Sequence, residues 1–160
     1  MRILTIATVI MAAMNFSNSL AENNEFIYNS EMKDSVLVSK TVYKKEEVSN
    51  TLTPYLKYLY SYDKLGRVSK KETVKWSIIT NKWENKNCIF YEYTINGYNL
   101  VYALWDNNKK KYSNIAEKKS FIQNTEDTTE VTSYKWSSKD KEWKKNNSMI
   151  MMTIDAQHIS

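Results

Sequence analysis

The sequence predicts an all-β fold: an antiparallel meander of repeated hairpins, arranged as a single twisted sheet, a sandwich or a partly closed barrel. Aromatic residues make up 13% of the 160 residues, whereas Gly occurs twice and Pro once. Aromatic side chains favour strands. Short apolar runs alternate with polar turns, and no stretch has sustained helical periodicity. A Trp-x6-aromatic spacing also recurs three times, which indicates a repeated hairpin unit.

The first 21 residues have the features of a cleaved signal peptide. Arg2 precedes an uncharged apolar run over residues 3–14, and Ser19-Leu20-Ala21 forms a small-x-small cleavage site. The run is too short to cross a hydrocarbon core of about 30 Å as a helix. We therefore expect residues 1–21 to be removed, leaving a secreted or periplasmic protein with no transmembrane span. A buried N-terminal helix is the other interpretation.

Residues 22–160 are then expected to form a single all-β domain, since this length can bury a core of its own. Apolar runs predict strands at residues 36–43, 56–62, 67–78, 88–95, 98–105, 111–123, 128–136 and 143–154. Asp63 to Gly66 predicts a turn in which Gly66 adopts positive φ. The polar residues 22–35 are predicted to be irregular.

Asn96-Gly97 predicts the central hairpin of the sheet. This dipeptide favours a two-residue type I′ turn, and apolar runs flank it on both sides. Tyr91 would then pair with Tyr102, and both would share a face with Tyr93 and Leu100. Cys88 would lie on the opposite face.

Three aromatic pairs share one spacing and form the candidate binding surface. Across a hairpin with an even loop, residues i and i+7 are direct partners, so each unit predicts two facing rings. If no bulge intervenes, strand parity places the first pair on the face of Tyr91 and the second on the other. At least one pair would then be partly exposed and could contact a glycan or a cell-surface protein. The alternative is that all are core residues and hairpin clamps. The residues are Trp76, Trp83, Trp105, Tyr112, Trp136 and Trp143.

Several chemistries are poorly supported by the composition. The net charge of +5 falls to +4 without Arg2, and Arg67 is then the only Arg, which argues against nucleic acid. With His158 as the only His and Cys88 as the only Cys, neither an N/S metal site nor a His-activated nucleophile is indicated. We predict no catalytic residues, metal or cofactor. Cys88 is expected to be buried, with a reactive thiol as the alternative.

The function that these observations favour is a noncatalytic binding or interaction module. The alternative is a hydrolase of envelope or dietary polysaccharide, which needs two carboxylates that converge in the fold. No feature of the sequence selects such a pair. The candidates are Asp63, Glu72, Glu84, Glu92 and Asp106.

Two patterns resemble known sequences. Residues 62–68, YDKLGRV, resemble the YDxxGRV hairpin of tyrosine–aspartate repeats in large bacterial cell-surface and toxin-delivery proteins. The wider pattern comprises YSYDKLGRVSKKETVKW, W-x6-W, YEY, VYALWDNNKKKY and YKWSSKDKEW. It resembles a family of small exported proteins from gut Bacteroidetes, the domain of unknown function 3836, over roughly residues 43 to 153. This resemblance implies an exported all-β fold and supplies no catalytic residue to carry over.

Overall fold

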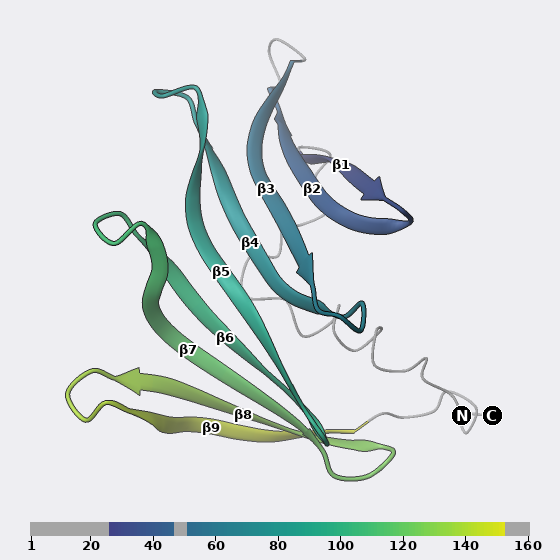
Figure 1. The fold of residues 1–160 in the computed structure, drawn as a ribbon, viewed down its shortest axis with the longest axis vertical. Coiled ribbons are helices and arrows are strands. Elements are labelled where there is room, and N and C mark those ends of the chain that lie inside the picture. The colour runs from purple at the N-terminus through teal and green to yellow at the C-terminus, as the bar shows by residue number, and fades with distance from the viewer. Residues whose placement is uncertain (1–25, 47–50, 153–160) are drawn as a thin grey trace.

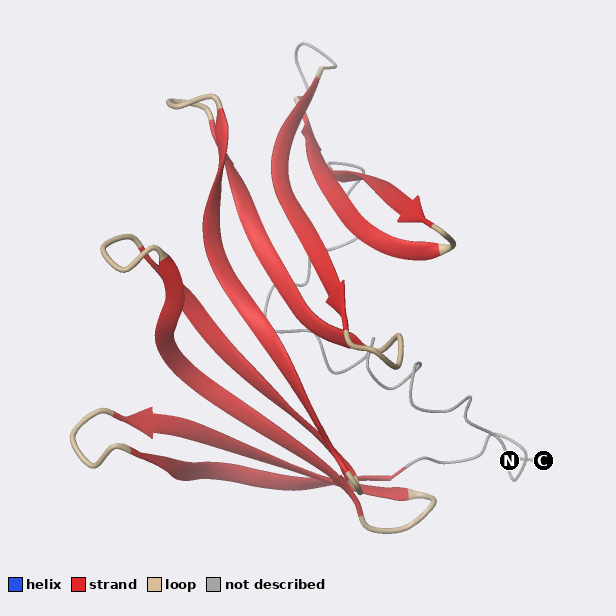
Figure 2. Cartoon of the chain, in the orientation of Figure 1, coloured by secondary structure: helices blue, strands red, loops and turns tan. Residues whose placement is uncertain are grey.

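The computed structural model describes residues 26–46 and 51–152, and all regular structure in this part of the chain is β-strand (Figures 1 and 2). Nine strands form one antiparallel sheet in sequence order. They are β1 (Phe26–Lys33), β2 (Val36–Lys45), β3 (Leu52–Tyr62), β4 (Val68–Ser77), β5 (Lys82–Thr94), β6 (Gly97–Asp106), β7 (Lys111–Gln123), β8 (Thr128–Ser137) and β9 (Glu142–Met152).

The predicted all-β meander is confirmed, and it takes the form of a single open sheet. Within the described residues β1 and β9 are its two edges, and each strand pairs only with its neighbours in sequence. No helix in this part of the chain is long and apolar enough to span a membrane. Residues 1–21 lie outside the described residues, so the signal peptide stays a prediction.

The predicted strands correspond to β2 to β9, whereas β1 was missed. The expectation that residues 22–35 are irregular is wrong from Phe26 onward. β1 is an edge strand with almost every side chain exposed, so it carries no apolar alternation. It is joined to β2 by Asp34 and Ser35, which have φ values of 50° and 64°. Positive φ at both central positions is the signature of a type I′ hairpin turn.

The largest buried cluster lies on one face of the sheet, which we call the inner face. Smaller side chains are buried on the opposite face, namely Val74, Cys88, Val101 and Ala103. The inner-face cluster is formed by Tyr91, Tyr98, Leu100, Phe121 and Val131. Val68 from β4 and Met151 from β9 both pack against this cluster, although four strands lie between β4 and β9 in the sheet. The sheet therefore curls around its inner face, and the lower ends of β5 to β9 lie close together in Figure 1.

The central hairpin differs from the prediction by one residue. Thr94 pairs with Gly97, so Ile95 and Asn96 form the turn, and Tyr91 pairs with Leu100 instead of Tyr102. The slip moves each partner by two residues, so the predicted shared face of Tyr91 and Leu100 is preserved.

Gly97 is needed for close backbone approach and not for positive φ. A Cβ at this position would lie 1.9 Å from the carbonyl oxygen of Phe121 on β7. Next to it, the N–H of Gln123 donates to the carbonyl of Asn96 at 2.9 Å. The glycine therefore begins β6 opposite Ile122 of β7, and the two-residue turn lies at Ile95 and Asn96.

The predicted turn at Asp63 to Gly66 is confirmed, with φ of 73° at Gly66. Asp63 Oδ1 accepts hydrogen bonds from the backbone N–H groups of Leu65 and Arg67, each at 2.9 Å. The Arg67 guanidinium lies 2.7 Å from Asp63 Oδ2. The Arg67 backbone N–H contributes most to lowering the pKa of the Asp63 carboxyl. Local side-chain bonding therefore fixes this turn.

Candidate binding surface

The three aromatic pairs face each other across adjacent strands, as the spacing predicted. Trp76 and Trp83 are direct partners between β4 and β5, and the other two pairs occupy the same place in the β6–β7 and β8–β9 hairpins. The ring centroids lie 5.1, 5.0 and 5.4 Å apart, with interplanar angles of 70°, 70° and 72°. Edge-to-face contacts of this kind are the favoured geometry of aromatic pairs.

The turns beyond these pairs are built alike. In each, the residue after the first aromatic ring accepts a hydrogen bond from the backbone N–H three residues later. The accepting atoms are Ser77 Oγ at 3.3 Å, Asp106 Oδ1 at 3.1 Å and Ser137 Oγ at 3.3 Å. The last turn residues, Asn81, Lys110 and Lys141, have φ values of 53°, 52° and 55°. The repeat is thus one structural unit used three times. We call residues 75–86, 105–112 and 135–145 the clamped tips.

All three pairs lie on the outer face of the sheet, opposite the core cluster, which corrects the parity prediction. The pairing of β4 with β5 shifts between Thr73 and Val74, leaving Lys86 as an extra residue in β5. A bulge reverses the alternation of side chains beyond it. Trp76 and Trp83 therefore share the face of Cys88, and not that of Tyr91.

The clamped tips extend beyond the continuous part of the sheet. Pairing between β5 and β6 ends at Asn87 with Leu104, and pairing between β7 and β8 ends at Glu117 with Lys135. Beyond these points the β4–β5, β6–β7 and β8–β9 hairpins no longer pair with one another, so the tips fan out (Figure 1). The paired rings are accordingly half-buried, and Trp136 is 39% exposed. The predicted partial exposure of at least one pair is confirmed.

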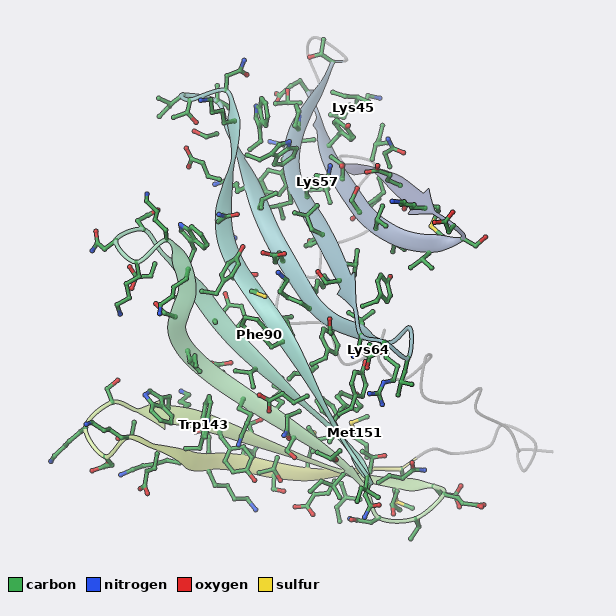
Figure 3. The ribbon with its side chains drawn as sticks, in the orientation of Figure 1. Lys45, Lys57, Lys64, Phe90, Trp143 and Met151 are labelled. Carbon is green, nitrogen blue, oxygen red and sulfur yellow. The ribbon has the colours of Figure 1, made fainter. Side chains whose placement is uncertain are left out.

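Side chains on the outer face bridge neighbouring tips. The Tyr112 hydroxyl donates to Asn85 Oδ1 at 3.5 Å, which joins the β6–β7 tip to the β4–β5 tip. Lys118 on β7 places its Nζ 4.8 Å from the Tyr134 ring centroid and 5.1 Å from that of Trp143. Figure 3 labels Trp143 on the β8–β9 hairpin, far from Met151 at its other end. Sequence reasoning missed Lys118, because no local pattern relates a lysine on β7 to a ring on β9.

Burial is the main cause of the raised pKa values of the titratable groups between the tips. Burial is the main cause of the raised pKa of the Tyr112 phenol, and the Glu72 carboxylate adds to it. Cys88 is fully buried, as expected, and burial raises the pKa of its thiol to about 12. Since the thiolate is the reactive form, Cys88 is an inert packing residue in the folded protein.

Each of the five candidate carboxylates has a hydrogen-bond or ion-pair partner within its own hairpin. Glu84 accepts a hydrogen bond from Thr80 Oγ1 at 2.9 Å, and Glu72 forms an ion pair with Lys70 at 2.8 Å. Asp106 accepts from turn N–H groups at one end of the sheet, and Asp63 does so in a turn of the opposite end. The hydrolase alternative gains no support from them. Among the described residues, no cluster of three His, Cys, Asp or Glu side chains could hold a metal ion.

Comparison with known proteins relates the chain to proteins without a described activity. The model of DUF3836, a family of unknown function, matches residues 1–124. A crystal structure of a protein of unknown function from Bacteroides fragilis has a TM-score of 0.69 at 25% identity, over 79% of this chain and 91% of that one. A DUF3836 family protein from Parabacteroides distasonis has a TM-score of 0.51 at 21% identity, over 79% and 89%. No curated protein is significantly similar.

Proposed function

The chain belongs to DUF3836, a family of unknown function, and we propose that it is an exported, noncatalytic binding module. Its contact surface is the outer face at the three aromatic pairs. The observation that carries this proposal is that all three half-exposed pairs lie on one face of adjacent hairpins. Export rests on the apolar run and cleavage site of residues 1–21.

A glycan chain is the ligand that suits this surface best. Aromatic rings bury large apolar areas and can stack on the apolar faces of sugar rings. The pairs repeat along three hairpins, so successive sugar units of one chain could contact successive pairs. Lys118, held over the rings of Tyr134 and Trp143, adds a cation for an acidic substituent. A protein partner would use the same rings as anchors, and it is the second candidate.

The test separates binding from folding, because the same rings clamp the hairpins. Trp136→Ala removes the 39% exposed ring. Binding of the exported protein to a panel of envelope and host glycans is measured beside urea unfolding. We expect Trp136→Ala to weaken glycan binding at least tenfold while the protein remains folded in the binding buffer.

Ile150→Ala is the matched control, since Ile150 is a 67% exposed apolar side chain on β9 away from the tips. This variant should bind like the unmodified protein. Equal loss in both variants, or unchanged glycan binding in folded Trp136→Ala, would mean that the pairs are purely structural.

A further inference from the structure

The turn of the β4–β5 tip carries two almost completely exposed isoleucines. Ile78 is 80% exposed and Ile79 is 97% exposed. Both lie beyond the Trp76–Trp83 pair, in the four residues that join the strands. Large apolar side chains at such exposure lose the favourable transfer from water that burial would provide. They contribute nothing to the core cluster.

The other two clamped tips show that this turn does not need isoleucine. Asn107 and Asn108 occupy the equivalent positions in the β6–β7 turn, and Ser138 and Lys139 do so in the β8–β9 turn. The three turns share the same capping bond and the same positive φ at their last residue. Polar residues therefore build the same turn, and the isoleucines require another explanation.

The clamped tips also concentrate positive charge. Residues 75–86, 105–112 and 135–145 contain eleven lysines and four acidic residues, a net charge of +7. The other described residues contain eleven basic and ten acidic side chains, a net charge of +1. Two of the acidic residues in the tips, Asp106 and Asp140, are already paired with Lys109 and Lys144. The three turns lie along one side of the molecule (Figure 1).

We propose that the clamped tips dock on a membrane surface that contains anionic lipid, with Ile78 and Ile79 inserted among the acyl chains. Lysines near an anionic surface are attracted to its headgroups. Exposed apolar side chains beside a basic surface bind at the boundary between headgroups and acyl chains, and Trp residues favour this same depth. The Trp76–Trp83 pair is separated from the turn that carries the isoleucines by one residue pair, Ser77 with Lys82. The strong charge of all three tips favours this surface over an apolar pocket in a protein partner, which would contact the β4–β5 turn alone.

The test measures sedimentation of the exported form of the chain with lipid vesicles. One set contains phosphatidylglycerol and phosphatidylcholine in equal parts, and the other contains phosphatidylcholine only. We expect binding to the anionic vesicles, together with a blue shift of Trp fluorescence. The double substitution Ile78→Ser with Ile79→Ser should weaken this binding at least tenfold, because it removes the side chains that insert among the acyl chains. The variant should remain folded, since neither isoleucine packs against the core cluster.

Leu65→Ser is the matched control, because Leu65 is a 75% exposed apolar residue in the β3–β4 turn, outside the tips. It should bind anionic vesicles like the unmodified protein. The proposal is overturned if the unmodified protein does not sediment with anionic vesicles, or if it binds both vesicle types equally. It is also overturned if the double serine variant retains full binding, or if Leu65→Ser loses as much as that variant does.

Discussion

The two ends of the sheet are stabilised in different ways. At the curled end, formed by the inner-face cluster and the turns β3–β4, β5–β6 and β7–β8, side chains from β4 to β9 pack together around Phe121. At the clamped tips the three hairpins no longer pair with one another, and one aromatic pair holds the two strands of each. Isolated two-stranded hairpins are only marginally stable in water. Long-range packing therefore stabilises one end, whereas a local, repeated aromatic pair stabilises the other.

This difference also explains where exposed surface is found. The curled end buries its rings against one another, as in the stacked contact of Tyr98 with Phe121 at 4.7 Å. The clamped tips leave their rings half-buried, because no second layer covers the outer face within the described residues. Surface for binding is therefore available at the end where stability is local.

The largest effect is expected from removing the centre of the curled end. Phe121→Ala should lower the free energy of unfolding by about 3–5 kcal/mol, because it leaves a cavity in the buried cluster. Trp143→Ala at a clamped tip should cost less than half as much, because its ring is half-buried. Urea unfolding of both variants measures the difference. Equal losses would contradict the distinction between the two ends.

Gly97 gives the next largest effect. Gly97→Ala should lower the free energy of unfolding by about 2–3 kcal/mol, because the new Cβ overlaps the Phe121 carbonyl and separates β6 from β7. Gly66→Ala is the control, because a Cβ at this position has no other atom within 4 Å. Only the φ of 73° opposes a side chain there, at a cost of about 1 kcal/mol. If Gly66→Ala proves the more harmful in the same urea assay, the close approach at Gly97 is not what holds the curled end.

Double-mutant cycles test whether the clamps act locally. For Trp76 and Trp83 we expect a coupling energy of about 0.5–1.5 kcal/mol from unfolding of the single and double Ala variants. For Trp83 and Trp143, which belong to separate tips, the coupling should be zero within about 0.5 kcal/mol. Strong coupling between separate tips would show that they are stabilised as one unit.

The smallest effect is a gain in stability at the turn of a clamped tip. Lys110 has φ of 52°, a conformation that costs a residue with a Cβ more than it costs glycine. Glycine relieves this strain but also increases the conformational entropy of the unfolded chain, which offsets part of the gain. Lys110→Gly should therefore raise the free energy of unfolding by about 0.5 kcal/mol. Lys111→Gly, in the adjoining strand, should lower it. A loss in both variants, measured by thermal unfolding, would argue against strain at the turn.

Local signals in the sequence were enough for the fold class, the order of β2 to β9 and the facing aromatic pairs. Alternation, turn residues and the Trp-x6-aromatic spacing act within one hairpin, and every hairpin in this sheet joins sequence neighbours. β1 was missed because an exposed edge strand has no buried face to produce alternation. The features that are set by interactions within one hairpin could therefore be predicted from the sequence.

The failures came from interactions between hairpins. Asn96-Gly97 was expected to be the turn, but β7 requires the glycine at the position where the strand begins. The bulge at Lys86 moved the first aromatic pair to the outer face. Neither the close approach of β7 at Gly97 nor the bulge at Lys86 is indicated by the sequence of the segment in which it occurs. For the candidate surface, the residues of the pairs were predicted correctly and their common face was not.

The strictly sequential strand order also bears on how the molecule forms. Each new pairing closes only a short turn, so the loss of chain entropy at each step is small compared with folds that join distant strands. The sheet can therefore grow by adding one strand at a time to an existing edge. The packing of Met151 against the cluster requires β9, the last strand in the described chain. Curling of the sheet is thus the step that waits for the whole chain, and the tips can be complete before it.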